Sequence, residues 1–309
     1  MKRRVIFLAG KTAVLSLPVK WVRQCGINKG DELEIDERGS ILTIKASLKG
    51  NDAPVEIDIS GMNSSLIWRY MNTIYKLGAS EIKIKYDNQE VYDLDKKKKI
   101  KTMDLMRNII NELIGLEIIK QGNNYCVVKE ISSVKEEEFD PVYRRIFFTL
   151  LNLARDSLDS IKNKDKEGIE NIVNYLDPNI NKLFKFCLRI LSKENTYVKD
   201  VISKTVILHG LERIGDLYSE ISRTLLRNKT MKLNSESLKL YGEVNDLLEL
   251  YYETYYKKDN KKVEDLHSKA KLLKEKLADS ESDLAVITVL KEINNQLREM
   301  IDWILTIEK

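Results

Sequence analysis

Residues 138–309 place Leu, Ile and Tyr at the 3.6-residue spacing of amphipathic helices and show almost no pattern typical of strands. The pattern is interrupted near Asn163, Pro178, Asn195, Asn228-Lys229, Asp259 and Asp279-Ser280. These interruptions predict about six helices, which divide into two sets of three at about 138–230 and 233–309. The sequence therefore predicts a C-terminal all-α bundle of two three-helix repeats.

Residues 52–133 have a mixed pattern. Strands are predicted at 55–60 and 81–87, helices at 64–79 and 102–115, and a hairpin at 116–131. This β-α-β-α-β-β order predicts a small α/β domain in the middle of the chain. The basic run Lys96–Lys99 lies in the expected loop before the second helix. We favour the interpretation that this loop is simply exposed to solvent over the interpretation that it binds phosphate.

Residues 1–46 predict short strands around one small helix. The helix begins after Pro18 and ends at Gly26, and a turn at Lys29-Gly30-Asp31 leads to the last two strands. So small a unit buries little apolar surface alone, and we expect it to need a partner chain. The whole chain is thus predicted to be a multidomain α+β protein.

Composition excludes several classes of protein. The 309 residues carry a net charge of only +4, three cysteines and two histidines. The cysteines lack metal-ligand spacing and fit reduced thiols. The scarcity of histidine argues against histidine-rich zinc centres and most Ser-His catalysis. Neither a secretory signal nor a membrane-spanning run of roughly 18 apolar residues is visible, so we expect a cytoplasmic protein that is not integral to a membrane.

Charge is segregated within the first forty residues. The first thirty residues hold seven basic side chains and no acidic one, whereas residues 31–39 hold five acidic side chains. One face of this small unit is therefore basic. A solvated surface and a DNA-binding surface explain the charge about equally well, since basic residues gathered on one face neutralise backbone phosphates.

The order of elements in residues 1–46 favours the second explanation. Leu17-Pro18 before a short helix, Gly26-Ile27 after it, Gly30-Asp31-Glu32-Leu33 and a final hairpin resemble the swapped-hairpin domain of the AbrB/MazE/SpoVT family. The resemblance implies a homodimer of interlaced hairpins that binds double-stranded DNA. It marks five residues as DNA contacts: Arg3, Arg4, Lys11, Lys20 and Arg23.

The helical region contains an unusual stretch, "HGLERIGDLYSEI", at residues 209–221. Glu212 and Asp216 are like charges at i,i+4, which destabilises a helix by roughly 0.2–0.5 kcal/mol. Gly215 between them costs about 1 kcal/mol more than alanine would. Either close packing of a neighbouring helix on the glycine, or a cation on the carboxylates, or both, explain the combination.

This stretch resembles the Glu-Arg-Ile-Gly-Asp motif of the PhoU family of phosphate uptake regulators. The resemblance spans about 138–309 and implies two three-helix repeats, with Glu212 and Asp216 as ligands of a divalent metal such as zinc or iron. His209 on the same helix and Asp177 on another are candidates for a third ligand. Lys291 and Asn295 occupy the equivalent place in the second repeat, so one metal site or none is expected.

Together, the two resemblances imply an archaeal-type regulator of phosphate uptake. We expect a DNA-binding transcriptional regulator whose helical domain senses or relays phosphate status, with phosphate transporter or signalling components as further partners. One alternative is a phosphate-signalling adaptor that acts by protein contact without DNA. A metal-dependent helical-bundle enzyme ranks last, because Glu264 and His267 form a single Glu-x-x-His pair and no phosphate loop or nucleophile motif is present.

Overall fold

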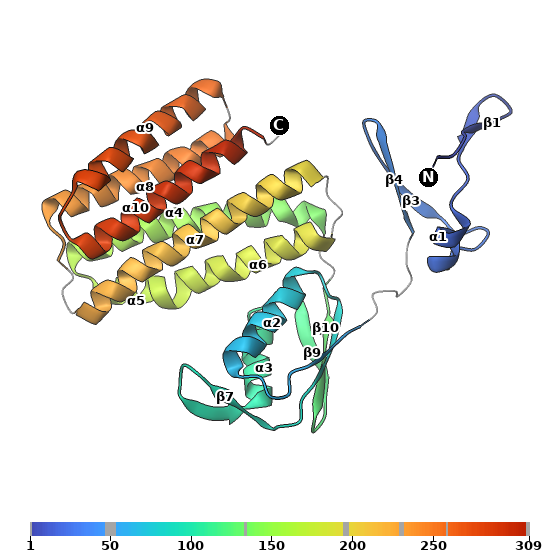
Figure 1. Cartoon of the computed structure of the whole chain (residues 1–309), viewed down its shortest axis with the longest axis horizontal. Helices are drawn as coiled ribbons and strands as arrows, with labels where there is room; N and C mark the ends of the chain where they lie inside the picture. Colours follow the sequence, from blue (N-terminus) through green and yellow to red (C-terminus); the bar gives the residue numbers. More distant parts are fainter. Residues whose placement is uncertain are drawn as a thin grey trace. The chain divides into compact units, whose positions relative to one another are not determined.

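The computed structural model describes residues 2–46, 54–132, 135–193, 198–228, 232–257 and 259–306. The chain divides into two compact units, residues 1–53 and 54–309. The predicted α/β domain and the predicted helical bundle both belong to the second unit, and the two units are described separately (Figure 1).

The first unit has two hairpins and one helix. β1 (Ile6–Leu8) pairs with β2 (Thr12–Val14), and β3 (Leu33–Arg38) pairs with β4 (Ile41–Ala46), both antiparallel. Helix α1 (Val19–Gln24) lies between the hairpins in sequence. The helix ends where the sequence predicts, because Gly26 adopts φ +62° and the Ile27 amide donates to the Val22 carbonyl at 3.0 Å. The elements expected in residues 1–46 are therefore present.

The α/β part of the second unit is a four-stranded sheet with two helices. The strand order is β5-β6-β10-β9, with β5 parallel to β6 and the other pairs antiparallel. The bounds are β5 (Val55–Asp58), α2 (Ser64–Lys76), β6 (Glu81–Lys85), α3 (Thr102–Asn111), β9 (Leu116–Gln121) and β10 (Tyr125–Glu130). Helices α2 and α3 contact each other and cover the buried face of the sheet.

One expectation for this part was wrong. The lysine run does not lie in a plain loop, because β7 (Glu90–Asp93) and β8 (Lys98–Lys101) form an additional antiparallel hairpin. Lys96 and Lys97 occupy its turn, and Lys98 and Lys99 belong to β8. The run escaped a strand prediction because consecutive lysines hide the alternation that marks a strand.

The helical part packs long helices side by side (Figure 1). A short 3₁₀ turn, η1 (Glu136–Glu138), precedes the first of them. The helices are α4 (Phe139–Asn163), α5 (Lys166–Asn171), α6 (Asp177–Lys193), α7 (Val198–Asn228), α8 (Ser235–Tyr256), α9 (Asn260–Asp279) and α10 (Leu284–Ile304). Their beginnings follow local chemistry, since Asn234 and Asp259 accept hydrogen bonds from the first amides of α8 and α9. None of the described helices is long and apolar enough to cross a membrane.

Several of the predicted helix boundaries are confirmed, but the expected break at Pro178 is wrong. The chain stays helical from α5 to α6 through a π-helical segment, η2 (Ile172–Leu176). There the Asp177 amide donates to the Ile172 carbonyl, five residues earlier. Pro178 has no amide hydrogen to place and falls in the first turn of α6, where proline is tolerated. The expected break at Asn195 lies outside the described residues.

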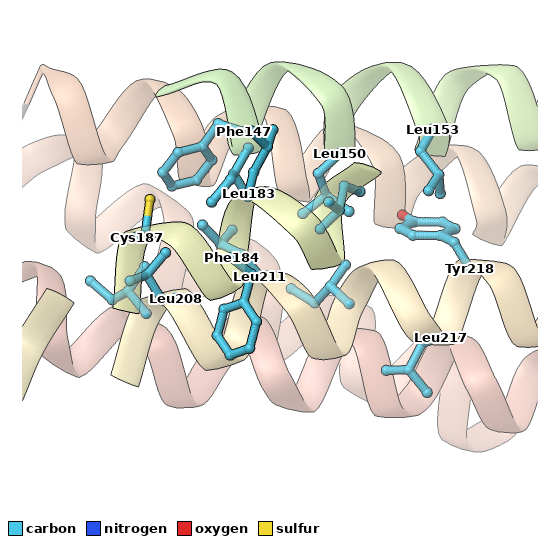
Figure 2. Packing of buried hydrophobic residues seen from close by; sticks show 14 of the residues in the cluster. Phe147, Leu150, Leu153, Leu183, Phe184, Cys187, Leu208, Leu211, Leu217 and Tyr218 are labelled. Carbon is cyan, nitrogen blue, oxygen red and sulfur yellow. The ribbon is translucent and has the colours of Figure 1, made fainter. Parts of the chain in front are cut away.

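The bundle core forms where α4, α6 and α7 meet (Figure 2). Figure 2 shows Phe147 and Leu150 of α4 near Leu183 of α6, with Leu211 of α7 beside them, while the ring of Phe184 points away from α4 and packs on His209 of α7. The apolar side chains among these are at most 7% exposed. The helical periodicity therefore buries the stripe that the sequence predicts.

A buried arginine joins the α/β part to the bundle. Arg189 of α6 is 0% exposed, and its guanidinium donates to the carbonyls of Tyr75 and Ala79 at 2.9 and 3.0 Å. Arg189 Nη2 also lies 3.1 Å from Glu130 Oε1 at the end of β10. Lys193 Nζ donates to the other Glu130 oxygen. One basic stretch of α6 thus binds both the end of helix α2 and the sheet.

We predict that Arg189→Met lowers the free energy of unfolding by about 3–5 kcal/mol, because it leaves Glu130 and two carbonyls without their buried partner. Chemical denaturation of the full chain measures the change. Arg155→Met is the matched control, since Arg155 pairs with Glu249 at 2.7 Å while both side chains are about half exposed. That exposed pair is worth at most about 1 kcal/mol. Equal losses in the two variants would contradict a special role for Arg189.

Candidate functional site

A cleft of about 880 Å³ opens between the α/β part and the bundle. One wall is a face of helix α2, on which Trp68, Asn72 and Lys76 recur every four residues. The opposite wall comes from η2, α6 and α7. The cleft exists because α2 packs on α6 beside Arg189, so residues far apart in the sequence share one surface.

The bundle wall carries three carboxylates. Glu212 and Asp216 lie one turn apart on α7, and Asp177 is the first residue of α6. Asp177 is only 4% exposed, and Arg223 Nη2 pairs with its Oδ2 at 2.9 Å while Asn181 Nδ2 donates to its Oδ1 at 3.4 Å. Burial, together with the charges of Asp216 and Asp177, raises the pKa of Glu212 to about 7. Burial and Asp177 also raise the pKa of Asp216.

The wall nearer α2 and α3 is basic and aromatic. Lys185 is 6% exposed, its Nζ lies 3.1 Å from Glu112 Oε2, and it stands 4.6 Å from the centre of the Trp68 ring. Burial lowers the pKa of Lys185, and the Glu112 carboxylate opposes that effect. Arg69 and Lys76 also line the cleft, without a hydrogen-bond or ion-pair partner among the described residues.

The structure brings together three of the four predicted metal ligands. Glu212, Asp216 and Asp177 line the same cleft, whereas His209 packs its ring against Phe184 at 4.9 Å and does not line it. Burial lowers the pKa of His209, as does Lys76. Within the described ranges no three His, Cys, Asp or Glu side chains are grouped so as to hold a metal ion. A metal ion on Glu212 and Asp216 therefore stays a prediction.

Gly215 faces away from this chemistry. A Cβ at Gly215 would lie 3.4 Å from Ile180 Cδ1 and 3.7 Å from Leu150 Cδ1, which are ordinary van der Waals distances. The close approach occurs instead at Gly210, which the sequence did not reveal, where a Cβ would overlap the Met300 side chain of α10. Gly215 thus lies at the contact of α7 with α6 and α4, but packing alone does not require a glycine there.

The five predicted DNA contacts lie in the first unit. Arg3, Arg4, Lys11, Lys20 and Arg23 are all exposed. Trp21 beside them is partly buried, in line with a packing role.

Sequence reasoning missed the basic and aromatic wall of the cleft. Lys185 and Arg189 stand at i,i+4 within the apolar run "LFKFCLRIL" of α6. Basic residues on an apolar helix stripe indicate buried polar contacts, and that signal could have marked the joint. No sequence pattern could have marked Trp68 as their neighbour, because the contact joins separate domains of the predicted scheme.

Comparison with known proteins gives one similarity. No family model and no curated protein matches the chain. Among solved structures, the chain is similar to the crystal structure of the phosphate transport system regulatory protein PhoU from Streptococcus pneumoniae. The match has 22% sequence identity and a TM-score of 0.39, and it covers 54% of this chain and 88% of that chain. A TM-score this low does not by itself establish a shared fold.

We predict that Glu212→Gln stabilises the protein at pH 8 in the presence of a chelator, by roughly 1–3 kcal/mol. The folded-state pKa of about 7 lies above the ordinary 4.5, so ionised Glu212 destabilises the fold above pH 7. The penalty fades as the pH falls from 7 towards 4.5, because the folded protein takes up the proton first. Thermal melts of both proteins from pH 4.5 to 8 measure the difference. A gain that does not change with pH would contradict the assignment.

Proposed function

We propose that the chain is a dimeric, DNA-binding transcriptional regulator whose helical part relays phosphate status inside the cell. The observation that carries the dimeric part is the lack of a core in the first unit. Of residues 2–46 whose burial is described, none is buried. A unit with defined strands and no core of its own needs surface from another chain.

The exposed apolar side chains of the first unit support a second copy as that partner. They lie on both hairpins and beside the helix: Val5, Ile6, Phe7, Leu8, Val14, Leu15, Val19, Ile35, Ile41 and Leu42. Phe7 is 67% exposed and Ile35 is 58% exposed. Water contact on so many large apolar groups is unfavourable, and interlaced hairpins of two chains would remove it.

Charge supports DNA as the ligand of such a dimer. Arg3 and Arg4 precede β1, Lys11 lies in the turn of the first hairpin, and Lys20 and Arg23 lie on α1. A dimer would present these exposed basic residues twice. Doubling the basic surface favours a duplex, because each neutralised phosphate releases counterions and adds affinity. On charge alone a solvated surface explains the basic residues about equally well, and the order of the elements in residues 1–46 favours DNA.

The phosphate part of the proposal rests on the resemblance of residues 211–221 to the PhoU family motif. In that scheme the bundle receives the signal and contacts transporter or signalling components. A divalent ion on Glu212 and Asp216 belongs to the same proposal, and elemental analysis of protein purified without chelator tests it. Glu212 and Asp216 supply only part of the coordination shell of a metal ion. Asp177, the candidate third ligand, already pairs with Arg223.

A phosphate-signalling adaptor that binds proteins alone is the second candidate, in which the first unit serves only to dimerise. The enzyme alternative gains no support from the structure. Glu264 and His267, the single Glu-x-x-His pair, are both exposed on α9. We therefore propose a role without catalysis.

We predict a dimer in solution that Phe7→Asp weakens at least tenfold, since a charge would be buried between two hairpins. Light scattering across a concentration series measures the dimer dissociation constant. Leu272→Asp on α9 is the matched control, because Leu272 is also exposed, at 54%, but lies in the bundle. A monomeric full chain, or equal weakening by both variants, would contradict dimerisation through the first unit.

We predict that replacing Arg3 and Arg4 with alanine weakens DNA binding and flattens its salt dependence. Each lost phosphate contact lowers the slope of log affinity against log salt by about 0.9. Fluorescence anisotropy with duplex DNA at several salt concentrations measures both quantities.

Replacing Lys96 and Lys97 in the β7–β8 turn is the control for this prediction, because it removes the same charge from the other unit. The control is expected to keep the wild-type slope. If the control loses affinity and the arginine variant does not, the DNA surface is on the α/β part. If the wild-type chain binds no DNA, the adaptor is favoured.

A further inference from the structure

The cleft between α2 and the bundle has features that the proposed carboxylate–metal pair does not use. Cations and carboxylates face the cleft from different elements: Arg69 and Lys76 lie on α2 and Lys185 lies on α6, whereas Glu212 and Asp216 lie on α7. Two other charged lining residues are already paired, Glu112 with Lys185 and Arg223 with Asp177. The Lys76 and Glu212 charges are close enough to interact. Lys76 lowers the pKa of Glu212, although burial and the neighbouring acids have larger effects that raise it. Arg69, Lys76 and Glu212 nevertheless form no ion pair within the described part of the chain.

The cleft also presents aromatic surface to solvent. Lys185 covers one face of the Trp68 ring, yet Trp68 remains 39% exposed. Tyr175, in the π-helical segment, is 69% exposed and lines the same cleft. Exposed aromatic rings beside cations are the surface on which planar heterocycles and their phosphates bind.

A buried amide supplies a third, independent observation. Asn72 lines the cleft, is 3% exposed and donates through Nδ2 to the Trp68 carbonyl at 2.7 Å. Its Oδ1 accepts no hydrogen bond from any described residue. A buried acceptor without a donor is unfavourable, and a ligand that brings an N–H group to it would relieve that cost. The adjacent π-helix is a feature that is frequent at functional sites.

We propose that this cleft binds a nucleotide as its magnesium complex. The α2 side, with Trp68, Arg69 and Lys76, takes the base and the phosphates, and the acidic side on α7 takes the cation. A volume of about 880 Å³ suits a ligand of this size and is far larger than a phosphate ion needs. A ligand that carries both an anion and a cation complements the charges of the basic and of the acidic side chains. A free phosphate or a metal ion alone would complement only one of the two sets.

If the chain is the proposed regulator, the nucleotide would be its effector. Only this regulatory role rests on the proposed function, and the binding itself does not. Nucleotide binding is measured on the full chain without DNA, so its failure and the failure of DNA binding are separate results. A ligand that touches α2 and α7 together would also strengthen the joint between the α/β part and the bundle.

Isothermal titration calorimetry on the full chain tests the proposal with four probes: ATP with Mg²⁺, GTP with Mg²⁺, ATP with EDTA, and inorganic phosphate with Mg²⁺. We expect one nucleotide per chain, bound at least tenfold more tightly with Mg²⁺ than with EDTA. No binding of either nucleotide would overturn the proposal. So would inorganic phosphate that binds as tightly as the nucleotide, or an affinity that EDTA leaves unchanged.

Variants locate the site. Arg69→Gln with Lys76→Gln is expected to weaken binding about tenfold or more, because two charge-assisted contacts are lost. Tyr175→Ala removes a side chain that is mostly exposed, so it leaves the fold intact and should also weaken binding. Lys239→Ala on α8, exposed and outside the cleft, is the control and should bind like the wild type. Wild-type affinity in both cleft variants would overturn the proposal.

Discussion

The second unit depends on the burial of Arg189. A guanidinium with 0% exposure cannot keep its hydration, so contacts with the protein must compensate for it. The Tyr75 and Ala79 carbonyls at the end of α2 accept hydrogen bonds from Nη1 and Nη2, Glu130 Oε1 lies 3.1 Å from Nη2, and the centre of the Tyr75 ring lies 4.8 Å from the guanidinium carbon. Nε has no acceptor among the described residues. Arg189 therefore acts as a C-terminal cap for a helix that belongs to another part of the chain. Burial alone would raise the pKa of Glu130, but Lys193 and Arg189 hold it below its ordinary value.

This joint explains why the cleft has a defined shape. Gly78 follows α2 with φ +91°, and a Cβ there would lie 2.8 Å from Lys193 Cγ, so the turn after α2 and the end of α6 approach closely. With one end of α2 fixed in this way, the face bearing Trp68 and Lys76 is held opposite α7. The walls of the cleft are thus joined by the contacts of α2 with α6 and with Arg189. Any ligand between them contacts both the sheet's helix and the bundle.

The sequence predicted local structure well where periodicity and capping decide it. The helices of residues 138–309 and the hairpin around Gly122 follow from spacing and turn chemistry, as do the elements of residues 1–46. It failed at Pro178, because a π-helix can carry a chain past a proline, and at Lys96–Lys99, because repeated lysines conceal a strand. The carboxylates of the cleft were found because they break helix rules. Trp68 and Lys185 were not found, because their meeting depends on the packing of α2 against α6, which no local pattern encodes.

The two units differ in how much apolar surface they bury within one chain. The second unit buries its own apolar stripes within one chain, together with polar links such as the hydrogen bond from Tyr218 Oη to Asn245 Oδ1 at 2.7 Å. The first unit has strands and a capped helix but no buried side chain among those described. If a second copy supplies its core, folding of the first unit is coupled to association, and its stability depends on protein concentration. Under that coupling, any change that alters association also alters the fraction of first units that are folded.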